Sequence, residues 1–338
     1  MNAAWHGFLE QSGAHIESDI VLDFGHPESE LRAAGSGSVL ADLSHLGAIE
    51  FAGEDAETFL QGQLSCDLKA IAPGCATLGG YCSPKGRMLA DFFLARGEDR
   101  FLMILPRSQC DFVQKRLRMF VLRSRVRLSE GTGVLLGVAG PGAGAALRTC
   151  FGDGFRPGAQ PRSEWVLQVP HERSILLVSA QQAEDAWKAL SATLRPVGSP
   201  CWQWLDIRGG IPMIVPATQD KLVPQMANLE LIGGVSFAKG CYTGQEVVAR
   251  AQYLGKVKRR MFLARLPAEA VPQAGDDLYS DDLGDQASGL VVDAQLSPDG
   301  VYDLLAVAQV SSKETSTVHL KAPGGPALQF VPLPYEVT

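Results

Sequence analysis

The order of strand-like and helix-like segments in the middle of the chain is the feature that most limits its fold. Hydrophobic periodicity there predicts a strand, a helix, two strands, a second helix and a final strand. The six segments are Val134–Ala139, Ala143–Cys150, Trp165–Val169, Ser174–Val178, Ala180–Leu194 and Trp202–Ile207. This βαββαβ order is the ferredoxin-like one, and it predicts an α+β domain.

The preceding part of the chain has a similar rhythm of strands and helices. Turn residues separate strands predicted at Ala76–Cys82, Met88–Ala95 and Phe101–Leu105, which follow two short strands within residues 39–51. Helices are predicted to begin near Asp55 and, with a capping-box-like sequence, at Ser108. Residues 1–35 show no clear pattern. The similar rhythm indicates a structural duplication of one α+β unit.

From Lys256 onward the sequence pattern predicts no helix, and short apolar runs alternate with turns that contain Pro, Gly and Asp. The runs are Met261–Leu266, Leu290–Ala294, Leu304–Val310, Thr317–Leu320 and Leu328–Val331. This pattern predicts a small antiparallel β-barrel. The predicted architecture is therefore an α+β domain of residues 1–130, a second of residues 131–255, and a β-barrel domain of residues 256–338.

Composition excludes several classes of protein. The net charge of −7 argues against a general polyanion-binding protein, whose affinity rests on excess positive charge. The longest uncharged run, residues 131–147, is too short and too rich in glycine to span a membrane. The seven cysteines lack C-x-x-C pairs, and the six histidines lack metal-binding spacing, so we expect no metal site. We expect a cytoplasmic monomer, because no secretory signal precedes the first domain.

The segment from Lys239 to Glu246, Lys-Gly-Cys-Tyr-Thr-Gly-Gln-Glu, carries the strongest chemical signal. Thr243 and Glu246 have the spacing of a capping box, which predicts a helix that starts at Gly244. Cys241 would then precede a helix N-terminus, where free N–H groups favour an anion, with the positive charge of Lys239 nearby. Both effects lower the pKa of a thiol, so Cys241 is a candidate reactive thiolate. The alternative interpretation makes Cys241 a packed small residue and Lys239 a solvated charge.

These eight residues resemble the signature of the YgfZ-type folate-binding proteins, a branch of the family of the glycine-cleavage T-protein, an aminomethyltransferase. Further segments also resemble this family, and the resemblance covers about residues 39 to 310. They are Leu43-Ser-His-Leu-Gly, Gly53-Glu-Asp-Ala-Glu-Thr-Phe-Leu-Gln-Gly-Gln-Leu, Ser83-Pro-Lys-Gly-Arg, Pro224-Gln-Met-Ala-Asn-Leu-Glu, Ser288-Gly and Ser297-Pro. The resemblance implies a clover-like, GcvT-like ring of two α+β domains and a C-terminal β-barrel around a central channel for tetrahydrofolate.

The resemblance also implies which residues act. By position, Lys239 and Cys241 are the functional pair of the family. Contacts with the folate are expected at Lys239, Tyr242, Gln245, Glu246, Asn228, Arg208 and Trp204. The implied role is a factor that binds tetrahydrofolate, or a one-carbon derivative, in iron–sulfur cluster biogenesis or repair and so supports tRNA modification. The implied partners are iron–sulfur enzymes or cluster-assembly proteins, and one thiol would not hold a stable cluster, which usually needs four ligands.

Two positions depart from the T-protein pattern. T-proteins carry an Asp shortly after a Gly-Gly pair, whereas the matching stretch here, Gly86-Arg-Met-Leu-Ala, is mostly apolar before Asp91. T-proteins also grip the pterin with a Glu where this chain has Arg208, so Asp206 or Glu230 would have to substitute for that Glu. A non-catalytic folate-dependent factor is therefore the first hypothesis, and a folate-dependent aminomethyltransferase is the alternative.

A third hypothesis, a tRNA-binding module, rests on basic residues. A strand predicted for Val121–Leu128 places Arg123, Arg125 and Arg127 on one face. Such a face suits a folate polyglutamate tail, an RNA phosphate or solvent. Solvent is the favoured interpretation, because no stacking aromatic residues alternate with these arginines.

Overall fold

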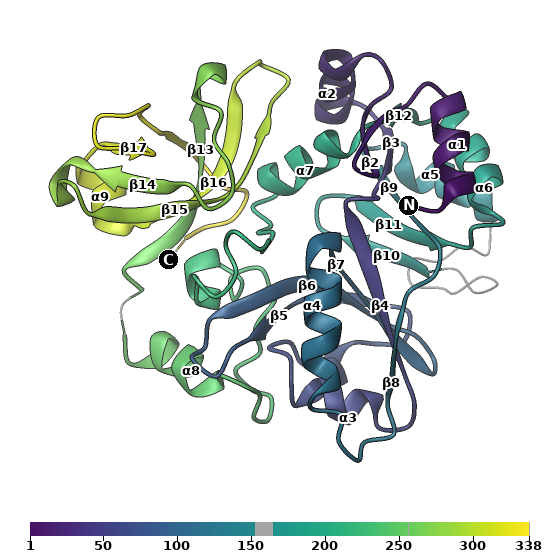
Figure 1. Cartoon of the computed structure of the whole chain (residues 1–338), viewed down its shortest axis with the longest axis horizontal. Coiled ribbons are helices and arrows are strands. Elements are labelled where there is room, and N and C mark those ends of the chain that lie inside the picture. The colour runs from purple at the N-terminus through teal and green to yellow at the C-terminus, as the bar shows by residue number, and fades with distance from the viewer. Residues whose placement is uncertain (153–164, 256, 338) are drawn as a thin grey trace. The chain divides into compact units, whose positions relative to one another are not determined.

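The computed structural model describes residues 1–152, 165–255 and 257–337. They group into two compact units, of residues 1–59, 68–77 and 93–205 and of residues 60–67, 78–92 and 206–338. The chain passes from one unit to the other several times, and Figure 1 shows the succession of elements by colour. The three consecutive domains remain a prediction, and Lys256, where the third would begin, lies outside the described residues.

The first sheet of the first unit contains the predicted βαββαβ succession. It consists of β9 (Val134–Ala139), α5 (Ala143–Phe151), β10 (Trp165–Val169), β11 (Arg173–Val178), α6 (Ala183–Ser191) and β12 (Arg195–Val197). The strands lie in the order β10-β11-β9-β3-β12, so β3 (Val39–Asp42) is inserted before the last strand. Among the described strands of this sheet, β12 pairs with β3 in parallel, and the other pairs are antiparallel. The predicted order of elements is confirmed, with one strand added.

The predicted position of the last strand in this succession is wrong. Trp202 and Ile207 lie in a helix, α7 (Ser199–Arg208), and the strand is β12, several residues earlier. The alternation of large and polar side chains from Trp202 spans too few residues to distinguish a strand from a buried helix. Trp202 and Trp204 are both buried, so both side chains belong to the hydrophobic core.

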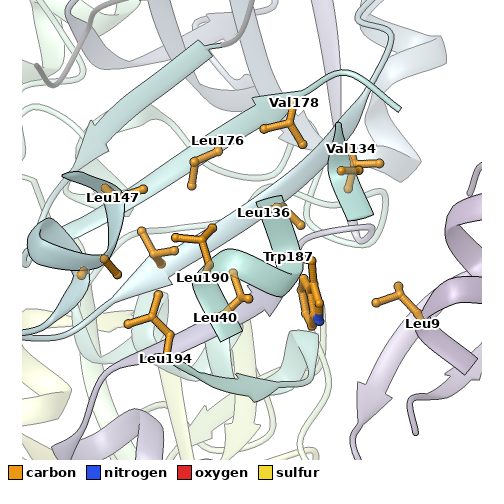
Figure 2. Close-up of a cluster of buried hydrophobic side chains, with 14 of the residues drawn as sticks. Leu9, Leu40, Val134, Leu136, Leu147, Leu176, Val178, Trp187, Leu190 and Leu194 are labelled. Carbon is orange, nitrogen blue, oxygen red and sulfur yellow. The ribbon is translucent and has the colours of Figure 1, made fainter. Parts of the chain in front are cut away.

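The N-terminal residues are structured although their sequence shows no clear pattern. They form α1 (Ala3–Gln11), β1 (His15–Glu17), β2 (Ile20–Asp23) and α2 (Pro27–Ser36). The Asn2 side chain caps α1 by accepting a hydrogen bond from the Ala4 N–H at 2.9 Å. Trp5 and Leu9 are one helical turn apart and join the core cluster that contains Trp187 of α6, whose ring centroid lies 5.6 Å from that of Trp5. Figure 2 labels Leu9 and Trp187 in this cluster.

The second sheet has the order β5-β6-β7-β4-β8. Its elements are β4 (Leu46–Ala52), α3 (Ala56–Gln61), β5 (Ala76–Cys82), β6 (Met88–Arg96), β7 (Arg100–Pro106), α4 (Arg107–Arg118) and β8 (Arg127–Glu130), with a short 3-10 helix η1 (Leu68–Ala70). These strands and helices agree with the predicted ones from residue 39 to residue 118. Strands β5 and β6 continue from one unit into the other.

Two details of this region were predicted incorrectly. Helix α4 has Pro106 at its N-cap and no side-chain cap, so the capping box at Ser108 does not form. The strand predicted for Val121–Leu128 is a turn that follows α4, and only Arg127 and Leu128 belong to β8. The three arginines therefore do not share one face of a strand.

The C-terminal part of the second unit is a six-stranded antiparallel sheet. The order is β17-β14-β15-β16-β13-β18. Its elements are β13 (Arg259–Leu266), η3 (Ala268–Ala270), β14 (Asp277–Ser280), η4 (Asp281–Leu283), β15 (Ala287–Leu296), β16 (Tyr302–Gln309), α9 (Val310–Thr315), β17 (Val318–Leu320) and β18 (Gln329–Val331). Because β17 and β18 end the order, the sheet is confirmed and a closed barrel is not.

The core of the second unit draws on segments that are far apart in sequence. Met88 of β6, Met261 of β13 and Leu305 of β16 share one cluster with Leu229 and with Val248 of α8 (Gln245–Tyr253). The short helix η2 (Pro224–Ala227) leads into this cluster. None of the helices in the described residues has the length and hydrophobicity to cross a bilayer.

Candidate functional site

The signature residues form a loop that leads into α8 in the second unit. Helix α8 begins at Gln245, with Gly244 at the N-cap, so the predicted helix start is confirmed to within one residue. The predicted capping box is wrong, because no side chain caps the helix and Glu246 instead accepts a hydrogen bond from Arg250 Nη2 at 3.2 Å. Gln245 is half-buried and Glu246 is exposed.

Glycine at position 244 brings the signature against the loop of residues 83–87. Gly244 has a φ of 82°, and a Cβ atom there would lie 2.3 Å from the Ser83 carbonyl oxygen. A Cβ atom on Gly86, whose φ is 69°, would lie 2.7 Å from Val247 Cβ. Ser83 Oγ also donates a hydrogen bond to Asp220 Oδ1 at 2.9 Å. Two of the sequence segments that carry the family resemblance are thus packed together.

Lys239 is a buried cation with two carbonyl acceptors. Its side chain donates to the backbone oxygens of Leu64 at 2.6 Å and Cys66 at 2.7 Å. The ammonium nitrogen also lies 5.3 Å from the ring centroid of Tyr242, a favourable distance for a cation–π contact. Burial lowers the pKa of Lys239 to about 8. Since only 8% of the residue is exposed, its interpretation as a solvated charge is wrong.

Cys241 has an exposed thiol. The other described cysteines of the second unit, Cys66 and Cys82, are buried, and burial raises the pKa of each to about 12. A thiol that is exposed reacts more readily than one that is buried and protonated. The interpretation of Cys241 as a packed small residue is therefore wrong.

Buried oxygen atoms without donors cluster along η2 and the residues that follow it. Gln225 uses its amide nitrogen to donate to the Val248 oxygen at 2.7 Å, and Asn228 uses its own to donate to the Met261 oxygen at 2.7 Å. Glu230 Oε1 accepts a hydrogen bond from Arg260. The remaining oxygens, Gln225 Oε1, Asn228 Oδ1 and Glu230 Oε2, are buried and have no partner in the described part of the chain.

Three free acceptors of this kind suit a ligand that carries N–H groups. A buried acceptor without a donor costs free energy, which a bound N–H group would offset. The amino group and ring N–H groups of a reduced pterin are donors of this kind. Sequence reasoning named Asn228 and offered Glu230 as a substitute, but it missed Gln225, which lies within the matching segment that begins at Pro224.

The other predicted contacts lie in different surroundings. Arg208 Nη1 is 3.8 Å from Asp303 Oδ2, and Asp303 also accepts a hydrogen bond from Arg265. Trp204 is buried in the part of α7 that belongs to the first unit. Tyr242 is buried, and its hydroxyl has no hydrogen-bond partner among the described residues.

A set of buried carboxyl groups in the second unit was not predicted as a site. Asp91 Oδ1 accepts a hydrogen bond from the Ile214 N–H at 2.7 Å. Burial, with a smaller contribution from the negative charge of Asp206, raises the pKa of Asp91 and of Asp293 to about 7. No sequence motif connects these three positions, so only the fold reveals that their charges interact.

Known proteins share both the sequence and the fold of this chain. The GCVT N-terminal domain family matches residues 21–160. The tRNA-modifying protein YgfZ of Edwardsiella ictaluri is 36% identical over 318 residues, which cover 91% of this chain and 96% of that protein. The chain belongs to the YgfZ family. The YgfZ protein of Photorhabdus laumondii is 34% identical, with 88% and 92% of the two chains covered.

The fold of this YgfZ family member is that of the T-protein. Glycine cleavage system aminomethyltransferase T from Bartonella henselae superposes with a TM-score of 0.80 at 19% identity. The superposition covers 98% of this chain and 97% of the aminomethyltransferase. The predicted GcvT-like α+β fold is thereby confirmed.

Proposed function

We propose that this YgfZ family member binds tetrahydrofolate, or a one-carbon derivative of it, and supports tRNA modification through iron–sulfur enzymes or cluster-assembly proteins. The observation that carries the folate part is the set of three buried acceptors along η2. The relatives of Edwardsiella ictaluri and Photorhabdus laumondii are tRNA-modifying proteins, which supports the tRNA part.

In this proposal Glu230, Asn228 and Gln225 hold the pterin through their free oxygens. Arg260 fixes the Glu230 carboxylate by bonding its other oxygen, and the backbone oxygen of Met261 fixes the Asn228 amide. Both acceptors are thereby oriented before the ligand arrives, which lowers the entropic cost of binding. Bound tetrahydrofolate would supply a carrier for one-carbon units.

Lys239 acts as a positioning residue in this proposal. Its two hydrogen bonds tie the signature loop to residues 64–66. Ser65 in turn donates a hydrogen bond to the Gly234 oxygen at 2.6 Å, so this loop is also attached to the chain just after Glu230. Lys239 thus connects the signature to the segment that carries the pterin acceptors.

The exposed thiol of Cys241 is the group proposed to meet a cluster, a sulfur species or a partner protein. Contact would be transient, because a single thiolate does not satisfy the ligand requirement of an iron–sulfur cluster. Asp91, the first carboxylate after the position that T-proteins use, is buried with one oxygen bonded to Ile214. This burial favours a non-catalytic factor over an aminomethyltransferase.

Calorimetric titration with tetrahydrofolate under anaerobic, reducing conditions tests the proposal. We expect saturable binding by the wild-type protein and an affinity at least about tenfold lower for Glu230→Gln, which removes the free carboxylate oxygen. Glu184→Gln is the matched control, because Glu184 is an exposed residue of α6 that pairs with Lys188 at 2.5 Å. Thermal unfolding of each variant measures whether the fold is retained.

Two results would contradict the proposal. If the folded wild-type protein does not bind tetrahydrofolate, folate has no part in its function. Equal affinities for wild type, Glu230→Gln and Glu184→Gln would show that the η2 acceptors are not the pterin site.

A further inference from the structure

Exposed apolar side chains gather on the flank of α4 and on the turn after it. Phe112, Met119, Phe120 and Leu122 are all exposed, within eleven residues of the first unit. Phe112, Arg116, Met119 and Phe120 recur at helical spacing beside the buried stripe of Val113 and Leu117. Contiguous exposed apolar groups of this kind mark interaction surfaces more often than scattered ones do.

The turn exposes the side chain of Leu122, and the backbone of this residue is strained. Leu122 has a φ of 45°, in the left-handed region that favours glycine, and 87% of its surface is exposed. An exposed leucine contributes no buried area that would offset this strain. Strain that stability does not explain is a recurrent feature of binding segments.

The same surface carries an excess of positive charge. Residues 112–127 include six basic residues and no acidic residue, although the whole chain has a net charge of −7. Lys115 pairs with Asp111 and Arg125 pairs with Glu54, which neutralises two of the six. Arg123 is exposed and has no hydrogen bond or ion pair in the described residues, whereas the Nε atom of the half-buried Arg116 is itself buried, without an acceptor there.

The occupant that matches this surface is an anion with flat, apolar faces. Exposed phenylalanine rings beside arginines suit unstacked bases, which stack on aromatic rings while their phosphates meet the cations. A carboxylate-rich peptide would satisfy the charge and leave Phe112 and Phe120 without a matching partner. We propose that this surface, defined as Phe112, Arg116, Met119, Phe120, Leu122 and Arg123, binds a single-stranded segment of RNA.

This inference goes beyond the proposed function, because it does not require folate. It also replaces the predicted strand of three arginines with a different set of residues on α4 and its turn, whose position Figure 1 shows. Only Arg123 belongs to both sets. The stacking residues absent from the predicted strand are supplied by the helix.

Fluorescence anisotropy with the full-length protein tests the inference. The probe is a fluorescein-labelled oligouridylate of about 12 nucleotides, with unfractionated tRNA as competitor. We expect Arg123→Glu to weaken binding at least about tenfold at low salt and to reduce the salt dependence by about one released counterion. Arg148→Glu, the same charge change at an exposed position of α5, is the matched control and should bind much more tightly than Arg123→Glu.

Two further variants separate stacking from charge. Phe120→Ala should weaken binding about threefold to tenfold without changing the salt dependence. Leu122→Gly removes the side chain and the backbone strain together, so the variant should unfold at no lower temperature and still bind more weakly. Calorimetry with tetrahydrofolate on the same variants should give the wild-type affinity, which keeps this test independent of folate binding.

Three outcomes would overturn the inference. One is the same RNA affinity for Arg123→Glu and Arg148→Glu. Another is unchanged binding by Phe120→Ala, which would leave only a general polyanion patch. The third is binding to phosphatidylserine vesicles by a protein that ignores the oligouridylate, which would make this a membrane-contact surface.

Discussion

Cys241 and Lys239 are two residues apart but have opposite surroundings. The thiol is exposed, whereas the ammonium group is buried against two carbonyl oxygens and an aromatic ring. A group that must meet a partner has to be accessible, and a buried cation is better suited to holding a loop in place. At the scale of single residues, the proposed function therefore assigns a reacting role to Cys241 and a positioning role to Lys239.

The first prediction concerns the accessible thiol. Cys241→Ser should fail to restore the activity of iron–sulfur enzymes in a strain that lacks the protein, because serine lacks the nucleophilic and metal-binding thiolate. Cys75→Ser is the matched control, since Cys75 is exposed in the first unit and should restore that activity fully. Enzyme activity in extracts, normalised to the amount of each variant, is the measurement. Full restoration by Cys241→Ser would remove the thiol from the function.

The second prediction concerns the buried carboxyl of Asp91, whose pKa burial raises to about 7 from 3.8. The folded state then holds this proton more tightly than the unfolded state does. The stability gained from the proton is fully present below about pH 4 and is lost as the pH rises to about 7. Asp91→Asn keeps an oxygen acceptor for the Ile214 N–H and cannot ionise, so it should be more stable than wild type above pH 7 by about 1–3 kcal/mol.

Urea unfolding at pH 4.5 and at pH 8 measures this difference. The gain should be present at pH 8 and nearly absent at pH 4.5. Asp285→Asn, at an exposed position of the same unit, should change stability little at either pH. An equal gain from Asp91→Asn at both pH values would show that the carboxyl is not protonated in the folded protein.

The sequence identifies the candidates in the signature, together with Asn228 and Glu230, but it identifies neither Gln225 nor the tertiary contacts of these residues. The motif identified Cys241 and Lys239, because their spacing from a helix start is local. It could not show that Lys239 bonds to residues about 170 positions earlier. It also could not show which oxygens of Gln225, Asn228 and Glu230 are left without donors, because the partners come from α8, β13 and Arg260.

At the scale of elements, periodicity located most strands and helices and failed in short or strained segments. The apolar strands β9 and β10 have the predicted bounds, and the amphipathic helix α6 lies within the longer predicted helix, because several turns or alternations agree with one another. Helix α7 was predicted as a strand, since the alternation from Trp202 to Asp206 fits both periods. The turn after α4 was predicted as a strand, because its arginines alternate with other residues at the two-residue period that is typical of a strand.

The third prediction concerns the start of α8. Gly244→Ala should destabilise the protein by about 2–4 kcal/mol, because the new Cβ would add a clash with the Ser83 oxygen to the strain of a positive φ. Gly300→Ala is the matched control, with a φ of 76° and open space around the new Cβ. It should cost only about 1 kcal/mol. Urea unfolding compares the two, and equal costs would show that the close approach to Ser83 is unimportant.

At the scale of the whole molecule, the arrangement of the core cannot be read from local patterns. The sequence predicts three consecutive domains, because composition and periodicity change near residues 130 and 256. Packing groups residues of β5 and β6 with the C-terminal sheet, so Cys82 and Met88 share a cluster with Leu263 and Val307. The residue pattern of each segment predicts its own secondary structure, but it does not indicate the distant segment against which it packs.

The fourth prediction follows from this shared core. A fragment of residues 256–338 keeps the strands of the C-terminal sheet but loses Cys82, Met88, Leu229 and Val248, which cover one side of its core. The loss exposes the apolar side chains of Met261, Leu263 and Leu305, and hydrophobic burial is the main source of domain stability. We expect the fragment to lack a cooperative thermal unfolding transition, measured by circular dichroism against the full-length chain. Cooperative unfolding of the isolated fragment would instead establish the C-terminal domain that the sequence predicts, with the remaining cluster, Val291, Leu304 and Leu320 among its members, as a sufficient core.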